Sequence, residues 1–482
     1  MTGINRRDWL KGAAATVAIA QSGLRAALAA PVTELPHKRP AKSERHFTSV
    51  AVENLITRVE RQIKDPSLAV LFENCFPNTL DTTVWPGTFE GKPDTYVVTG
   101  DIDAMWLRDS SAQLWPCLPL AKEDEPLRQL LEGAIRRQAR NILLDPYANA
   151  FMRDPTAKPL SWAVNDHTEH HAGVGERKWE IDSLCYTIRL AYGYWKQTGD
   201  TKPFDAAWKE AAWTIVRTFK TQQRKDGPGP YSFQREAAAP SDSVPLGGFG
   251  NPARPVGMIY SMFRPSDDSC IFPLFVPANL FAVTSLRQLA ELAAKVAGDT
   301  KLAEEATALA AEVEHAVHQY GKVQHETLGE IWAYEVDGYG NKLMMDDANA
   351  PGLLSLPYLG CCRIDDPLYQ RTRRFVLSKA NPYFFSGKAA EGVGGPHIGL
   401  DMVWPMSILI RAFTTTDERE ILQCVRWLRD TTAGTGFMHE SFNKDDPSKF
   451  TREWFAWANT LLGELVVKLA AERPAMLAGS LG

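Results

Sequence analysis

Apolar residues recur every three to four positions in one segment after another beyond residue 48. In segment 204–223, for example, Phe204, Trp208, Ile215 and Phe219 fall on one side of a helix with 3.6 residues per turn. This period predicts amphipathic helices with one buried face. The same pattern predicts helices over residues 49–64, 108–121, 124–143, 180–198, 204–223, 276–296, 300–318, 366–379, 400–414, 416–431 and 453–472.

Long loops rich in glycine and proline separate many of these helices, over residues 76–107, 144–178, 224–275, 321–360 and 380–399. Loops of this length inside a folded domain usually carry function. One alternating piece, 331–336, predicts a strand in a hairpin. Strands and helices do not alternate regularly and no GxGxxG follows a strand, which disfavours a Rossmann domain or a TIM barrel. We therefore predict an all-α fold, an (α/α)6 barrel whose long loops form the active-site end, with one catalytic domain over residues 47–475.

The first thirty residues have the order of a twin-arginine export signal. Arg6 and Arg7 precede an apolar run over residues 12–20 and a small-residue stretch over 26–30. The apolar run is too short for a permanent membrane anchor. The alternative is a chance Arg-Arg pair before an alanine-rich helix. We predict a signal peptide over residues 1–30, a flexible lead-in over 31–46 and a periplasmic or secreted protein.

The net charge of the chain disfavours two classes of binding partner. The formal net charge of −5 includes +3 from residues 1–30, so the processed chain would carry −8. A mildly acidic protein is a poor match for nucleic acid or an anionic membrane.

The cysteines and histidines show no metal-binding spacing. The seven cysteines lack a CxxC pair, and most lie in apolar patterns, which favours free buried thiols with one disulfide possible. His167, His170 and His171 lie together, but their segment has no helical pattern that would place them on one face. A plain loop, or histidines that bind sugar hydroxyls, is favoured over a metal site. We expect no cofactor.

One stretch, residues 98–115, mixes charged residues with tryptophan. It contains Asp101, Asp103, Trp106, Arg108, Asp109, Gln113 and Trp115. Apolar surroundings make buried charge costly, so several charges there indicate a functional site. Aromatic faces beside hydrogen-bonding groups suit a sugar. The alternative is a buried Arg–Asp pair that caps the following helix.

Other motifs supply candidate catalytic carboxyl groups. Hydrolysis of a glycosidic bond by acid and base needs two, one protonated and one ionised. Asp267 and Asp268 are adjacent, so each disfavours ionisation of the other, and Glu440 lies between His439 and Ser441. The alternatives are a helix-capping pair and a structural ion pair. Glu453 and Asp182 are weaker candidates because both fall inside helical patterns, and no motif favours a serine or cysteine nucleophile.

Three motifs together resemble glycoside hydrolase family 125, the exo-acting α-1,6-mannosidases. They are TGDIDAMWLRDS from residue 99, FRPSDDSC from residue 263, and HESFNKDDP from residue 439 with FTREWFAWAN from residue 450. The resemblance covers nearly the whole chain after about Phe47. It implies an (α/α)6 barrel and a metal-independent inverting hydrolase that releases mannose from the non-reducing ends of α-mannosides.

The resemblance also implies roles for residues. The general acid would be Asp267, with Asp268 the competing choice, and the general base Glu440. Asp268, if ionised, would raise the pKa of Asp267. The residues expected to bind substrate are Asp103, Trp106, Arg108, Asp109, Gln113, Arg264, Asp268, His397, Asp401, Trp404 and His439.

Two other functions compete with this one. The first is another inverting hydrolase on the same barrel that acts on α-glucosides. The second is an inactive carbohydrate-binding protein, which would be expected to lack one of the two carboxyl groups. The predicted partner is an α-mannoside oligosaccharide, and the sequence specifies neither its length nor an oligomeric state.

Overall fold

The computed structural model describes residues 34–479 and 481, and the chain from Leu35 onward forms one unit. The predicted signal peptide lies outside these residues. No helix among them is both long and apolar enough to cross a membrane. All seven cysteines lie in the described part, and each is a free thiol.

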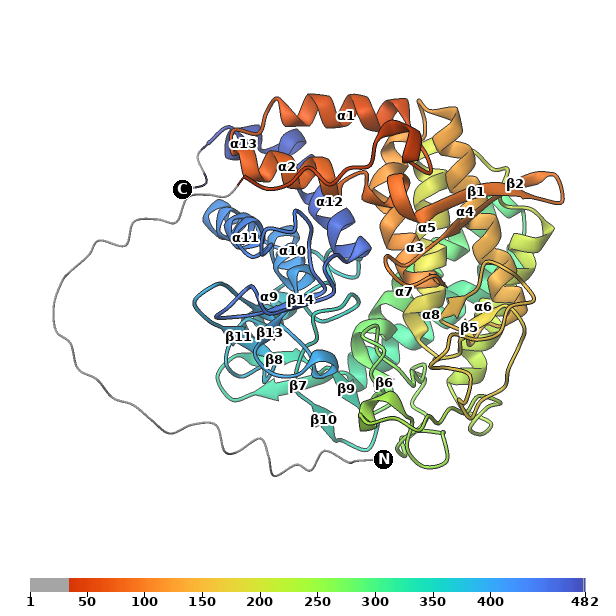
Figure 1. Cartoon of the computed structure of the whole chain (residues 1–482). Coiled ribbons are helices and arrows are strands. Elements are labelled where there is room, and N and C mark those ends of the chain that lie inside the picture. The colour runs from red at the N-terminus through yellow and green to blue at the C-terminus, as the bar shows by residue number, and fades with distance from the viewer. Residues whose placement is uncertain (1–33, 480, 482) are drawn as a thin grey trace, which may run out of the picture. The chain divides into compact units, whose positions relative to one another are not determined.

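Helices dominate the described part of the chain (Figure 1). They are α1 (Val50–Glu60), α2 (Pro66–Cys75), α3 (Leu107–Leu114), α4 (Glu125–Leu144), α5 (Ile181–Thr198), α6 (Ala206–Gln222), α7 (Val276–Leu292), α8 (Thr300–Tyr320), α9 (Pro367–Val376), α10 (Pro405–Phe413), α11 (Glu418–Asp430), α12 (Ala456–Glu472) and α13 (Pro474–Leu477). Every helix that the apolar period predicts is present, with ends shifted by a few residues. The prediction omitted α2 and α13.

Local sequence sets where several helices begin and end. The side chains of Asp124 and Asp299 accept hydrogen bonds from the backbone N–H of Leu127 and Leu302, which caps α4 and α8. Helix α5 ends at Gly199, whose φ of 70° is a conformation that glycine adopts without strain.

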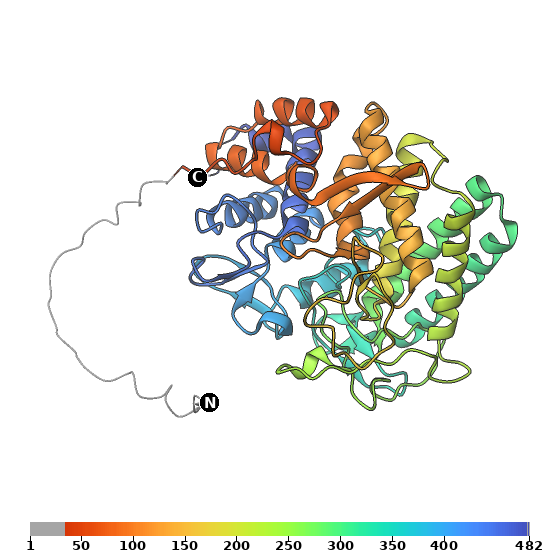
Figure 2. The same cartoon turned by 45° about the vertical axis from the view of Figure 1, so that its right-hand side comes forward.

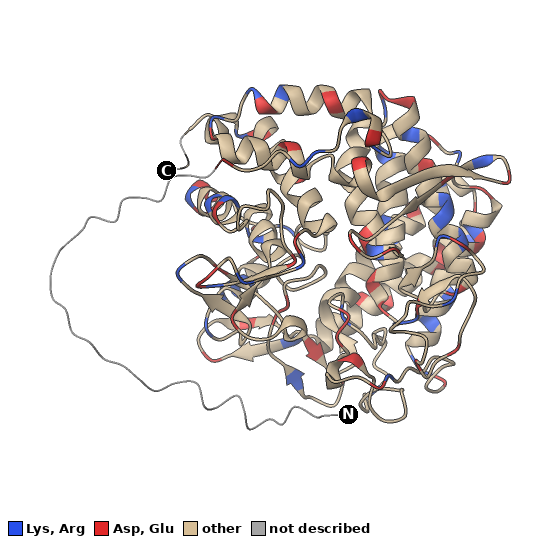
Figure 3. Cartoon of the chain, viewed as in Figure 1, with Lys and Arg blue, Asp and Glu red and all other residues tan. Residues whose placement is uncertain are grey.

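The helices pack in two sets. Helices α3, α5 and α7 are neighbours in that order, and α12 packs against both α10 and α3. Helices α4, α6 and α8 lie outside them and pack against one another (Figures 1 and 2). This arrangement is consistent with the predicted double ring. Lys and Arg are interspersed with Asp and Glu along the outer helices (Figure 3).

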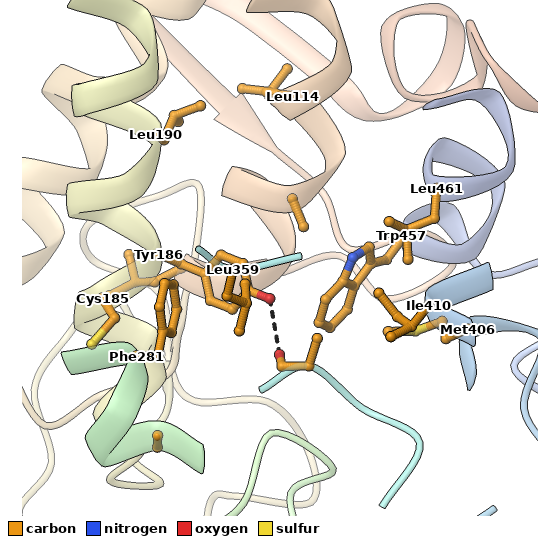
Figure 4. Close-up of a cluster of buried hydrophobic side chains, with 14 of the residues drawn as sticks. Leu114, Cys185, Tyr186, Leu190, Phe281, Leu359, Met406, Ile410, Trp457 and Leu461 are labelled. Carbon is orange, nitrogen blue, oxygen red and sulfur yellow. Dashed lines mark hydrogen bonds between the residues drawn. The ribbon is translucent and has the colours of Figure 1, made fainter. Parts of the chain in front are cut away.

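A buried segment without a regular helix, residues 345–361, links the two sides of the inner set. The hydroxyl of Tyr186 on α5 donates to the carbonyl of Ala350 (3.0 Å), and the hydroxyl of Tyr358 donates to Glu464 on α12 (2.8 Å). Trp457 on α12 meets Tyr186 edge to face, with ring centroids 5.9 Å apart. Apolar side chains from α3, α5, α7, α10 and α12 surround this contact (Figure 4), so the core continues from one side of the inner set to the other.

The strands are short and lie in the long loops. They are β1 (Val84–Phe89), β2 (Lys92–Val97), β3 (Met105–Trp106), β4 (Ala150–Phe151), β5 (Val174–Glu176), β6 (Leu274–Phe275), β7 (Lys322–His325), β8 (Gly329–Trp332), β9 (Glu335–Val336), β10 (Lys342–Leu343), β11 (Phe384–Ser386), β12 (Glu391–Val393), β13 (Met402–Val403), β14 (Ser441–Asn443) and β15 (Phe450–Thr451). The predicted strand over 331–336 is split between β8, which pairs with β7, and β9. Two of the sheets, β3-β4-β5 and β13-β14-β15, position the candidate site.

The described part of the expected lead-in is held against the domain rather than flexible. Arg39 contacts both Asp81 (2.8 Å) and Glu53, and its own side chain is largely buried. Leu35 is buried in the core. The prediction rested on proline and lysine content, which does not reveal an arginine that pairs with carboxylates distant in the sequence.

Candidate active site

Two cavities meet among the long loops. We call them the inner pocket, of about 50 Å³, and the outer chamber, of about 760 Å³. Both are lined by Ile102, Trp106, Asp267, His397, Glu440 and Arg452, so these residues mark the junction. Both candidate catalytic carboxyl groups therefore lie where the cavities meet.

The sheet β13-β14-β15 places three residues at one of its ends. Trp404 follows β13, Glu440 precedes β14 and Arg452 follows β15, and the antiparallel pairing brings these positions side by side. Arg452 Nη1 donates to Glu440 Oε1 (3.3 Å), and the Thr451 hydroxyl donates to Oε2 (3.0 Å). The carboxylate of Glu440 is thus held by a cation and a hydroxyl from the neighbouring strand.

The sheet β3-β4-β5 also positions residues at the junction. Its register places Trp106 next to Ala150, and Ala150 next to Glu176. Asn149, just before β4, accepts a hydrogen bond from Lys178 N–H (3.1 Å) and donates to Glu176 (3.0 Å) and to Asp267 Oδ1 (3.4 Å). This sheet therefore orients Asp267 even though Asp267 belongs to another loop.

Asp267 is at the tip of a tight turn. Its N–H donates to the Arg264 carbonyl (2.9 Å), and its φ of 68° lies in the left-handed region, which is uncommon for a residue with a side chain. Lys178 Nζ donates to the carbonyl of Asp267 (2.8 Å) and holds the turn. Such strain is often found where a side chain must be aimed at a site. The side chain of Asp267 is 28% exposed, whereas that of Asp268 is only 2% exposed.

Arg108 is the centre of a buried cluster of carboxyl groups, which we call the Arg108 cluster. Its guanidinium lies 2.5 Å from Glu180, 3.4 Å from Asp109 and from Asp182, and 3.7 Å from Asp267. Three of these four carboxyl groups, Asp109, Glu180 and Asp182, are buried beside a single guanidinium, which favours protonation of at least one of them. One oxygen each of Asp109, Glu180 and Asp182 has no hydrogen-bond partner among the described residues.

Within this cluster, burial favours a proton on Glu180. Burial raises the pKa of Glu180 well above its usual range, because the opposing effect of Arg108 is smaller and the negative charges of Asp182 and Asp267 add to the shift. Burial also raises the pKa of Asp109, and it raises that of Asp182 to about 6. Glu180 and Asp267 are close enough for their carboxyl groups to share a hydrogen bond.

The pKa of Asp267 itself is lowered, contrary to the prediction that Asp268 would raise it. Burial acts to raise it, but the positive charges of Lys178 and Arg108 and the hydrogen bond with Glu180 outweigh burial. Asp268, which lies 3.5 Å from His397 Nδ1, is not among the main influences on the pKa of Asp267.

His397 provides a cation at the junction. Burial lowers its pKa, but the hydrogen bond with Asp268 and the charges of Asp268, Asp267 and Glu440 raise it to about 9. At neutral pH both ring nitrogens thus carry protons. One faces Asp268, and the other can donate to a bound group.

The inner pocket is rich in polar groups that lack partners. Among the described residues, four buried N–H groups of its lining side chains have no hydrogen-bond partner: Trp106 Nε1, Trp404 Nε1, Trp457 Nε1 and Arg452 Nε. Arg108 Nε and Asp109 Oδ2 form an ion pair at 3.4 Å without a hydrogen bond. Buried polar groups are normally satisfied, so each needs an explanation. Aromatic walls with unpaired N–H groups and a carboxylate match the C–H faces and hydroxyls of one sugar ring.

The structure brings most of the strongest sequence candidates together but not all of them. Asp267, Glu440, Trp106, Arg108, Asp109, His397 and Trp404 line the inner pocket. Six predicted substrate-binding residues line neither cavity: Asp103, Gln113, Arg264, Asp268, Asp401 and His439.

Three of these six are turned toward internal partners. Gln113 donates to the carbonyl of Val98 (3.2 Å), and Arg264 donates to the buried Glu335 (2.6 Å). The ring nitrogens of His439 face backbone carbonyls, including that of Arg452 (3.2 Å). Each of these three side chains thus makes internal contacts that stabilise a loop of the site.

The other three are placed differently. Asp103 and Asp401 are exposed, and Asp401 lies 3.5 Å from Lys444 Nζ. Asp268 acts through His397. The motif patterns identified the correct loops, but they did not show which side chain of a loop faces inward.

Several lining residues had no predicted role. Arg452, Asn349, Phe455 and Trp457 line the inner pocket. Arg452, Phe455 and Trp457 fall within the quoted FTREWFAWAN motif, so the sequence offered a signal for them. Asn349 lies in a segment without any motif.

The loop histidines show no metal arrangement. His170 Nε2 contacts the carbonyl of Asp166 (2.8 Å), and His171 Nε2 lies 3.4 Å from Glu169. Within residues 34–479 and 481, no group of His, Cys, Asp and Glu is arranged to hold a metal ion.

Comparison with known proteins points to one family. Residues 65–467 match the family described as metal-independent alpha-mannosidase (GH125). The meiotically up-regulated gene 157 protein of Schizosaccharomyces pombe is 43% identical over 460 residues, which cover 92% of this chain and 90% of that protein. A solved structure from Streptococcus pneumoniae is 40% identical with a TM-score of 0.84, covering 89% of this chain and all of that one. It is described as a metal-independent alpha mannosidase in a non-productive complex with alpha-1,6-mannobiose.

Proposed function

The chain belongs to the metal-independent α-mannosidases of glycoside hydrolase family 125, and on this premise we propose that it is an exo-acting, inverting α-1,6-mannosidase on an (α/α)6 barrel. One observation carries the proposal. Asp267, on the turn after Arg264, and Glu440, just before β14, both line the junction of the two cavities. A terminal mannose in the inner pocket would place its glycosidic bond at that junction, with the leaving sugar in the outer chamber.

The proposed reaction uses both carboxyl groups in one step. Asp267 donates a proton to the glycosidic oxygen while the bond from that oxygen to the anomeric carbon breaks. Glu440 accepts a proton from a water molecule whose oxygen forms the new bond to the anomeric carbon. Attack from the face opposite the leaving group inverts the configuration, and the two carboxyl groups must stand about 6.5–9.5 Å apart to admit the water.

The Arg108 cluster explains how Asp267 obtains its proton. The pKa of Asp267 is lowered, whereas burial raises the pKa of the neighbouring Glu180 well above its usual range. We assign the acid to the pair: Glu180 stores the proton, and Asp267, the partner that faces the junction, delivers it. Such coupled groups titrate as a unit rather than as separate residues.

Linkage and sugar specificity are the parts of the proposal to test first. The enzyme should release mannose from α-1,6-mannobiose much faster than from the α-1,2, α-1,3 and α-1,4 isomers, and it should not cleave aryl α-glucosides. From α-1,6-mannotriose labelled at the reducing end, an exo enzyme releases unlabelled mannose first. Early appearance of labelled mannose would contradict exo action, and efficient release of glucose would favour the α-glucoside alternative.

We also propose export by the twin-arginine route, on the basis of residues 1–30. A reporter fused to these residues should reach the periplasm of a bacterium. Replacement of both Arg6 and Arg7 by lysine should retain the reporter in the cytoplasm. Export that survives this change would contradict the proposal.

A further inference from the structure

The outer chamber is larger than one sugar unit requires. Its volume of about 760 Å³ falls within the range of about 300–1,000 Å³ that is usual for sites of drug-sized ligands. Trp162, Arg235 and Asp242 line this chamber but not the inner pocket. The chamber thus extends beyond the junction, on the side where the leaving part of a substrate would lie.

Trp162 offers an aromatic face to this chamber. The residue is 46% exposed, which is unusual for so large an apolar side chain. Its only polar group is already used, because Nε1 donates to Glu176 Oε1 (3.2 Å). The surface that remains accessible is therefore ring carbon, which suits the C–H face of a sugar.

Trp162 is anchored to the same scaffold as the acid side. Glu176, which accepts from the indole, also accepts from Arg235 (2.8 Å) and from Asn149 (3.0 Å). Asn149 in turn donates to Asp267 (3.4 Å). Hydrogen bonds through Glu176 and Asn149 thus connect the indole to Asp267 without a substrate.

The charges that line the chamber argue for a neutral ligand. Of the cations that line only the outer chamber, Lys178 contacts Asp242 (3.2 Å), and Arg235 contacts both Asp166 (2.6 Å) and Glu176. In the described part of this wall, acidic residues outnumber basic ones and each cation has a carboxylate partner. A phosphorylated or otherwise anionic chain would meet net repulsion.

We propose that Trp162 is the stacking platform of a leaving-chain site, which binds the second and later sugars on the leaving side of a neutral mannooligosaccharide. This inference rests on the proposed function and names its substrate class. It predicts that an α-1,6-linked trisaccharide is a better substrate than the disaccharide, because only the longer chain reaches the indole.

The test compares kcat/KM for α-1,6-mannotriose with kcat/KM for α-1,6-mannobiose. In Trp162→Ala the ratio of the two should fall about three- to tenfold, the effect of one lost stacking contact. Trp162→Phe keeps a ring but loses the N–H, and its ratio should stay within about twofold of the parent value. Trp85→Ala is the matched control, because Trp85 on β1 is 42% exposed but lines neither cavity.

The outcomes separate this inference from the proposed function. A ratio that Trp162→Ala leaves unchanged would overturn the leaving-chain site. An equal loss on both substrates would also overturn it, because Trp162 would then act through Glu176 on Asp267. If the parent enzyme cleaves neither substrate, the proposed function fails and this inference fails with it.

Discussion

The surroundings of the proposed acid, Asp267, and of the proposed base, Glu440, differ in how the charge of the carboxyl group is balanced. On the acid side, Asp267 shares one guanidinium with three other buried carboxyl groups, and burial pushes a proton onto Glu180. On the base side, Glu440 accepts hydrogen bonds from the Thr451 hydroxyl and from Arg452, which also pairs with Asp101. An excess of buried carboxyl groups stores a proton, whereas a carboxylate matched with its own donors is an acceptor. This difference supports the two proposed catalytic roles.

Removal of either carboxyl group should have the largest effect. We expect Asp267→Asn and Glu440→Gln each to lower kcat by about 10³-fold or more while the fold survives, since each removes an essential proton transfer. Steady-state kinetics on α-1,6-mannobiose measures this. A 2,4-dinitrophenyl mannoside needs little acid assistance, so it should restore much of the rate in Asp267→Asn but not in Glu440→Gln.

Asp268→Asn is the matched control for the acid, and at pH 6 it should lose far less activity than Asp267→Asn. If Asp268→Asn is inactive while Asp267→Asn turns over normally, the general acid is Asp268 and not Asp267.

Loss of the stored proton should have the next largest effect. Glu180→Gln keeps the shape of the side chain, but it leaves the proton to Asp267 alone, whose pKa is lowered. We expect kcat to fall about 10- to 100-fold at pH 7. The raised pKa of Glu180 keeps the proton in place as pH rises, so without it the alkaline limb of the pH–rate profile should move to lower pH.

Asp182→Asn is the control for that experiment. Asp182 also contacts Arg108 but does not share a hydrogen bond with Asp267. An alkaline limb that moves equally in both variants would show that the total charge of the Arg108 cluster matters and not Glu180.

A smaller effect is expected at His397. Asp268 contributes to raising its pKa to about 9, above the ordinary value of about 6.5, so the cation persists through pH 8 and is lost as pH rises through 9. In Asp268→Asn the pKa should fall, and KM for mannosides should rise several-fold at pH 8 but little at pH 6. A proton NMR titration of His397 checks the shift directly, and an unchanged titration would contradict it.

The smallest effect is expected from chelation. The proposed reaction needs no Lewis acid, and the family is described as metal-independent. Treatment with EDTA should change kcat less than twofold. If activity is lost on chelation and returns with calcium or zinc, the reaction needs a metal ion, and the loop histidines become its candidate ligands.

The sequence alone predicted the helices well because each must bury a stripe of apolar residues. Helix α2 was the main omission, since it is short and buried on most sides and so shows no clear stripe. The hairpin of β1 and β2 fell inside a region predicted only as a loop. Its strand β1 is mostly exposed, so it has little of the alternation that marks a half-buried strand.

The site was predictable at the level of loops but not of side-chain direction. Asp267 and Asp268 are adjacent in sequence, yet the positive φ of Asp267 sends the two side chains to different partners. Glu180 was missed as a partner of Asp267 because 87 positions separate them and only the fold brings both to Arg108. Trp162 and Asn149 lie in loops without any motif.

The stereochemistry of the first product tests the central claim most directly. Proton NMR during early hydrolysis of an α-1,6-mannoside should show β-mannose before mutarotation sets in, because water activated by Glu440 attacks from the face opposite the leaving group. Early appearance of α-mannose would mean retention through a covalent intermediate. That result would contradict the role of Glu440 as the general base, and the assignment of acid and base to Asp267 and Glu440 would fail with it.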